Sequence, residues 1–127
     1  MDKTEFVEAY PALIKNALAL GQKARREGIL ALEGEIDPVK IKERDILHYG
    51  LSMMADGTDG ELIKKILGNI IAREKDEYAR IYKIIQMEAV AGIQNGMNTR
   101  MLYYILNSYT DIPFKDDGIY AEIAKNQ

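Results

Sequence analysis

The longest helical pattern in the chain covers residues 58–96 and reads TDGELIKKILGNIIAREKDEYARIYKIIQMEAVAGIQNG. Thr58 and Glu61 have the spacing of a capping box, in which a hydroxyl and a later carboxylate accept from free backbone N–H groups. Apolar residues then recur at helical spacing, and they are Leu62, Ile66, Ile70, Ile81, Ile85 and Ile93. The pattern predicts one long central helix, Asp59 to Gln94, about 50 Å long. The charged residues 73–80 would form its solvated face.

A first helix is predicted on the N-terminal side of the central one. Pro11 suits the first turn of a helix, where a missing N–H costs nothing, and Gly34 suits the position just after a last turn. The apolar face between them repeats three and four residues apart. Residues 4–10 then form either a short preceding helix or a kinked extension of the same one.

Two further helices follow from capping signals. Asp37-Pro38 opens a second helix, because Asp accepts from free N–H groups and Pro fits the first helical position. Asp56-Gly57 ends it, just before the capping box. Asn98 caps a fourth helix, which cannot continue past Pro113. Residues 110–127 are a C-terminal tail in which Asp117 to Lys125 can form a short helix.

Composition is typical of one helical domain and excludes several functions. The 127 residues are 47% hydrophobic and 29% charged, which fits an all-α, single-domain bundle of about four helices over residues 1–127. Cysteine is absent, so thiol catalysis and thiolate metal sites are excluded. A net charge of −3 gives no basic field for nucleic acid. No apolar run reaches the ~20 residues of a membrane span, and a cytoplasmic protein is expected.

Candidate catalytic and metal-binding residues are few. His48 is the sole histidine, lies beside the apolar pair Ile46-Leu47, and has no nucleophile or oxyanion loop nearby in the sequence. Packing explains it better than catalysis. Asp56, Asp59 and Glu61 lack the alternating ligands of a 12-residue calcium loop, and helix capping explains them. We therefore expect no enzymatic activity, no metal and no cofactor.

A charge cluster in residues 23–33 is less easily explained by folding alone. Arg26 and Glu33, seven residues apart, would project from nearly the same face of the first helix, with Arg25 to one side. Glu33 and Glu35 would lie near the C-terminal end of that helix, where a negative charge is unfavourable. These charges are either an ordinary solvated face or a partner-binding surface formed by Arg25, Arg26 and Glu33.

Three segments of the chain resemble one protein family. Residues 24–33 read ARREGILALE, residues 49–63 read YGLSMMADGTDGELI, and residues 87–100 read MEAVAGIQNGMNTR. They resemble the patterns A-R-x-E-G-L-L-A-L-E, G-L-x-L-x-x-D-G-T-D-P-E and E-G-x-x-x-I-Q-x-G-x-N-P-R in the cytoplasmic part of MotA, the ion-driven flagellar stator subunit. In that family two membrane helices separate the second and third patterns. Here residues 73–83 join them directly, and Thr99 replaces the usual proline.

The resemblance implies a role for the charge cluster. In the family, the Arg and Glu of the first pattern contact complementary charges on the rotor switch protein FliG, and they correspond to Arg25 and Glu33. The resemblance thus implies a non-catalytic protein at the cytoplasmic face of the flagellar motor. Its partners would be FliG or stator components, and self-association is a further option. The alternative is a structural helical adaptor that shares the fold but has an unrelated partner.

Overall fold

Seven helical segments make up residues 1–111, the part of the chain that the structure, a computed structural model, describes. They are α1 (Lys3–Glu27), the 3-10 helix η1 (Ile29–Glu35), α2 (Pro38–Lys42), α3 (Ile46–Ala55), α4 (Gly60–Ile71), α5 (Glu77–Gln94) and α6 (Thr99–Asn107). No strand occurs within those 111 residues, and the predicted all-α class is confirmed. The predicted short helix at Asp117 to Lys125 lies outside the described residues.

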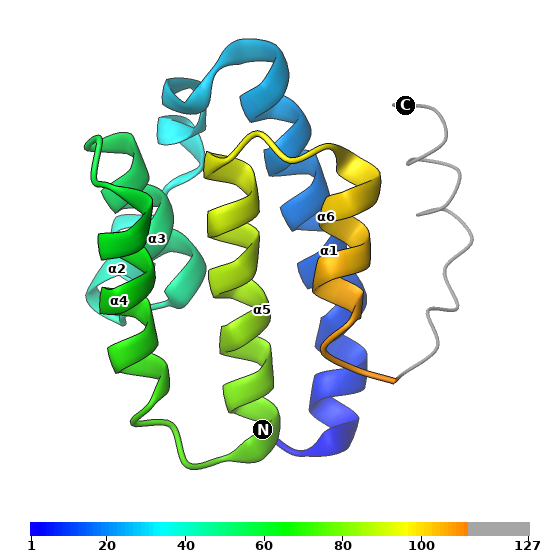
Figure 1. Ribbon diagram of the computed structural model, residues 1–127. Coiled ribbons are helices and arrows are strands. Elements are labelled where there is room, and N and C mark those ends of the chain that lie inside the picture. Colours follow the sequence, from blue (N-terminus) through cyan, green and yellow to red (C-terminus); the bar gives the residue numbers. More distant parts are fainter. Residues whose placement is uncertain (112–127) are drawn as a thin grey trace.

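The centre of the bundle is α5. It contacts α1, α3, α4 and α6, with α3 and α4 on one side and α1 and α6 on the other (Figure 1). Its inward residues are almost fully buried, and they include Ile85, Ala89, Val90 and Ile93. Burial of each large apolar side chain stabilises the fold by roughly 1.5–3 kcal/mol, so the packing around α5 holds the bundle together.

The prediction of a single helix from Asp59 to Gln94 is wrong, because the chain folds back between α4 and α5 (Figure 1). Asp76 starts α5 by accepting a hydrogen bond from the Ala79 N–H at 2.8 Å. The turn lets α4 pack against α5, which one straight helix could not do. Residues 73–76 are therefore a charged turn, and the longest helix is α1, with 25 residues.

The apolar row predicted for α4 is also shifted by one position. The buried residues are Ile63, Leu67 and Ile71, whereas Leu62 is 50% exposed. Both rows repeat every four residues, so periodicity alone does not separate them. The position of α5 decides which row is buried.

The boundaries of α1 differ from the prediction at both ends. Asp2 and Glu5 form a capping box, in which the Glu5 N–H donates to Asp2 Oδ1 at 2.8 Å and the Asp2 N–H to Glu5 Oε1 at 3.2 Å. Pro11 therefore lies inside the helix, and residues 4–10 are its extension. The helix ends at Gly28, whose φ of 91° favours glycine, and η1 follows where continued α-helix was expected.

The predicted second helix is interrupted as well. Asp37 caps α2 as expected, accepting from the Val39 N–H at 2.9 Å. The chain then turns at Arg44, which has a φ of 57°, and Asp45 caps α3. The Asp45 N–H donates to the Lys40 carbonyl and the Arg44 N–H to the Ile41 carbonyl. This pair of bonds is a Schellman motif, and it separates α2 from α3.

The expected capping role of Thr58 is wrong. Asp59 is the N-cap of α4, and its side chain accepts from the Glu61 N–H at 3.1 Å. Asp56 and Gly57 end α3 as predicted, with Gly57 at a φ of 81°. The Thr58 N–H donates to the Met53 carbonyl and completes the end of α3. Thr58 is thus the last residue of a Schellman motif rather than the first of a capping box.

Candidate functional site

The predicted partner-binding residues lie on two different helices. Arg25 and Arg26 are in the last turn of α1, where a cation is favoured by the helix dipole, and Glu33 is in η1. The sequence predicts that Arg26 and Glu33 lie on nearly the same face of one helix. This prediction is wrong, because the helix ends at Gly28 and Glu33 lies in η1. All three side chains are exposed.

These three charges make no hydrogen bond or ion pair within residues 1–111. Nearby charges behave differently. Lys23 Nζ lies 3.0 Å from Glu35 Oε1 and joins α1 to η1. That pair gives Glu35 a structural role, whereas Arg25, Arg26 and Glu33 are exposed and have no side-chain partner within the described fold.

One end of the bundle brings together parts of all three segments that carry the family resemblance. We call it the η1 end, residues 24–36, 56–60 and 94–98, where the chain turns at the top of Figure 1. Gln94 Nε2 donates to the Thr58 carbonyl at 3.0 Å and ties the last residue of α5 to the α3–α4 turn. η1 packs on α1 and α3. Gln94 was not singled out from the sequence, although it is the Gln of the third pattern.

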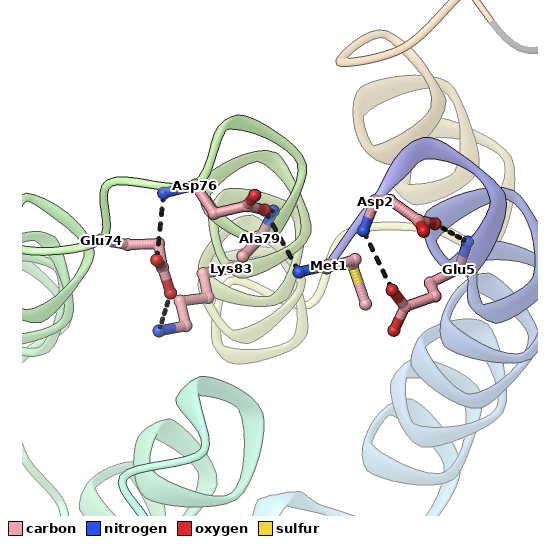
Figure 2. Close-up of polar contacts among 7 residues, drawn as sticks. All are labelled: Met1, Asp2, Glu5, Glu74, Asp76, Ala79 and Lys83. Carbon is pink, nitrogen blue, oxygen red and sulfur yellow. Dashed lines mark hydrogen bonds and ion pairs between the residues drawn. The ribbon is translucent and has the colours of Figure 1, made fainter.

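The opposite end, residues 1–6, 72–78 and 107–111, holds a set of paired charges around the α4–α5 turn, and we call it the closed end. Glu74 accepts from Lys83 Nζ at 2.9 Å and from the Asp76 N–H at 3.2 Å, and the Met1 ammonium lies 3.5 Å from Asp76 Oδ2 (Figure 2). The hydrogen bond from Lys83 is the main reason that the pKa of the Glu74 carboxyl is lowered. These bonds fix the α4–α5 turn.

Aromatic rings fill the interior behind the closed end. Phe6 lies 5.7 Å from Tyr10, 5.5 Å from Tyr78 and 6.5 Å from Tyr82, measured between ring centroids. The Tyr10 hydroxyl donates to Asn107 Oδ1 at 2.6 Å and joins α1 to the end of α6. Burial raises the pKa of Tyr10 to about 12. The tyrosines here are packing residues.

His48 makes a hydrogen bond that joins two helices, which is a structural role. Its Nδ1 accepts from the Asp37 N–H at 3.1 Å, which joins the start of α2 to α3.

Within residues 1–111, no group of three or more His, Cys, Asp or Glu side chains lies close enough together to hold a metal ion. Across the same range, none of the helices combines the length and the hydropathy needed to cross a membrane.

Comparison with known proteins identifies relatives with one shared name. The chain is 31% identical over 85 residues to Motility protein A of Treponema phagedenis, covering 67% of this chain and 32% of that protein. It is 40% identical over 65 residues to Motility protein A of Helicobacter pylori, covering 51% and 24%. With Motility protein A of Treponema pallidum it shares 33% over 66 residues, covering 52% and 24%.

The chain spans between about a quarter and a third of the length of these curated relatives. No family model matches the chain, and no solved structure matches it. The three relatives share a name and come from two bacterial genera, and each match covers half of this chain or more. These matches confirm the resemblance to the MotA-like family that the sequence motifs indicate.

Proposed function

We propose that this protein is a non-catalytic component of the flagellar motor that docks through the η1 end to the rotor switch protein FliG or to stator components. The relatives named Motility protein A support a role in motility. Such docking would occur at the cytoplasmic face of the motor.

The observation that carries the proposal is the set of three exposed charges at the η1 end. Arg25, Arg26 and Glu33 have no partner in residues 1–111, whereas the neighbouring Lys23 and Glu35 are paired with each other. Exposed charges of this kind contribute little to folding. They are suited to recognition, since complementary charges at the edge of an interface set its specificity and association rate. Binding should be weak and sensitive to salt.

A titration of the purified protein with purified FliG at low and physiological salt tests this function. We expect Arg25→Glu and Glu33→Lys each to weaken binding by up to about tenfold, because each reversal replaces attraction with repulsion. Their melting temperatures should stay near that of the wild type. Lys65→Glu is the matched control, because it reverses an exposed charge on α4, away from the η1 end.

Two results would reject docking to FliG. One is the absence of wild-type binding at low salt, and the other is wild-type affinity in both reversal variants. Capture of an unrelated protein from a lysate of motile cells, together with either result, would favour the structural adaptor.

A further inference from the structure

Leu30 is the most exposed large hydrophobic residue in residues 1–111, with 66% of its surface accessible. It is not on a loose segment. Its neighbour Ile29 packs against the core, and Leu32 is only 1% exposed. The Lys23–Glu35 ion pair joins the end of η1 to α1. The fold therefore holds Leu30 in a fixed outward position on a short, anchored helix.

The geometry of η1 places Leu30 beside a charge. A 3-10 helix has three residues per turn, so side chains three apart are eclipsed. Ile29 and Leu32 share the inward face, and Leu30 and Glu33 share the outward one. At about 2.0 Å of rise per residue, these two positions are about 6 Å apart along the axis. Leu30 is thus one turn from an unpaired carboxylate.

The backbone on both sides of Leu30 is accessible. A Cβ added at Gly28 or at Gly34 would meet no neighbouring atom within 4 Å. Arg25 and Arg26 precede the first glycine at the end of α1. An approaching protein can therefore reach Leu30 without displacing any described part of the bundle.

We propose that Leu30 is the apolar anchor of the η1 end. It inserts into an apolar pocket on the partner, whose edge carries a basic group facing Glu33 and an acidic group facing Arg25 or Arg26. An apolar centre within a charged rim is the usual anatomy of a protein interface, and the centre contributes most of the binding energy. This inference rests on the proposed function, with the switch protein as the partner.

Leu62 provides a matched control on the same bundle. It is 50% exposed, lies on α4, and is likewise a leucine at the start of a helix. The neighbouring Lys64 is paired with Glu88 at 3.3 Å. Leu62 therefore reports what the loss of an exposed leucine does outside the proposed anchor.

The experiment is a titration of Leu30→Ala, Leu30→Met, Leu62→Ala and Arg25→Glu with purified FliG over a series of salt concentrations. We expect Leu30→Ala to weaken binding by about tenfold at every salt concentration, as for an interface anchor. The slope of log Kd against log salt should stay as in the wild type, because no charge is removed. Arg25→Glu should change that slope. Leu30→Met, which keeps the apolar volume, and Leu62→Ala should bind within about twofold of the wild type.

Thermal unfolding separates binding from folding, since a side chain this exposed should leave the melting temperature unchanged when shortened. Wild-type affinity in Leu30→Ala, with weaker binding in Arg25→Glu, overturns the anchor and leaves the proposed function in place. Leu30→Met binding as weakly as Leu30→Ala also overturns it, because the pocket would not be recognising apolar volume. If the wild type does not bind FliG at any salt concentration, both proposals fail.

Discussion

The two ends of the bundle differ in what some of their charges do. At the closed end, Glu74 is bonded to Lys83 and to the Asp76 N–H, and the Met1 ammonium lies beside Asp76. At the η1 end, Arg25, Arg26 and Glu33 face solvent without partners in the described chain. The paired charges of the closed end thus fix a turn, whereas these three charges of the η1 end fix nothing in the described chain and are available to another molecule.

The ends differ in their apolar residues as well. Phe6, Tyr10, Tyr78 and Tyr82 pack together behind the closed end, and Phe6 is only 1% exposed. The η1 end displays Leu30, which is more exposed than any large hydrophobic residue of the closed end. Under the proposed function, stability and recognition are assigned to opposite ends of the bundle, so substitutions at one end should leave the other largely unaffected.

The strongest test of this separation is Phe6→Ala. Loss of a buried phenylalanine should reduce the free energy of unfolding by about 3–5 kcal/mol, because three ring contacts disappear and a cavity remains. Urea denaturation measures the loss, and the fraction that stays folded should bind FliG with unchanged affinity. Val7→Ala, at the adjacent exposed position, should change stability by less than about 0.5 kcal/mol. A loss below about 1 kcal/mol in Phe6→Ala would show that the rings do not hold the closed end.

Alkaline pH should weaken the same aromatic cluster. The folded protein raises the pKa of Tyr10 from 10.0 to about 12, so the unfolded chain releases this proton first. The free energy of unfolding that comes from keeping Tyr10 protonated is fully present below pH 10, and it is lost as the pH rises from about 10 towards 12. The loss is at most about 3 kcal/mol, at roughly 1.4 kcal/mol per pKa unit.

Urea unfolding at about pH 9 and about pH 11 checks the alkaline effect. Tyr10→Phe should show a shallower fall between the two values, with the remainder from Tyr82, whose pKa burial also raises. An equally steep fall in Tyr10→Phe would assign the effect to other groups.

A smaller effect is expected at the start of α4, within the η1 end. Asp59→Ala removes the side chain that accepts from the Glu61 N–H, and the loss of such a cap costs about 1 kcal/mol. Thr58→Ala should cost less than about 0.5 kcal/mol, because Thr58 bonds through its backbone, which the substitution keeps. Its carbonyl accepts from Gln94 Nε2, and its N–H donates to the Met53 carbonyl. The denaturant midpoints of the two variants show which residue caps α4. A larger cost for Thr58→Ala would restore the capping box predicted from sequence.

Features set by neighbouring residues were predictable from sequence. Asp37 and Asn98 cap helices as expected, because a side chain and the N–H groups that it satisfies are close in the chain. The all-α class follows equally from local periodicity. The turn at residues 73–76 could have been found, since Asp76-Glu77 is itself a typical helix start.

Features set by tertiary packing were not predictable in the same way. Whether Leu62 or Ile63 is buried depends on where α5 lies, and a shift of one position leaves the spacing unchanged. Gly28 and Gly34 are both suitable helix ends, and only the packing of Leu32 and Ile29 shows that the helix ends at Gly28. The family pattern predicts a partner-binding role for Arg25 and Glu33, which stays a prediction, whereas the exposure of Leu30 is visible only in the fold.

The uninterrupted course of α1 has a mechanical consequence. Its 25 residues form a rod about 37 Å long, which runs from the cap at Asp2 to Gly28 and passes through Pro11 without ending. An axial push on Arg25 and Arg26 would pass along one continuous helix towards the far end of the bundle, with a single backbone hydrogen bond missing at Pro11. Because α5 and α6 brace the rod along its side, the bundle should resist bending. A load received at one end would therefore be delivered at the other as displacement rather than lost as local deformation.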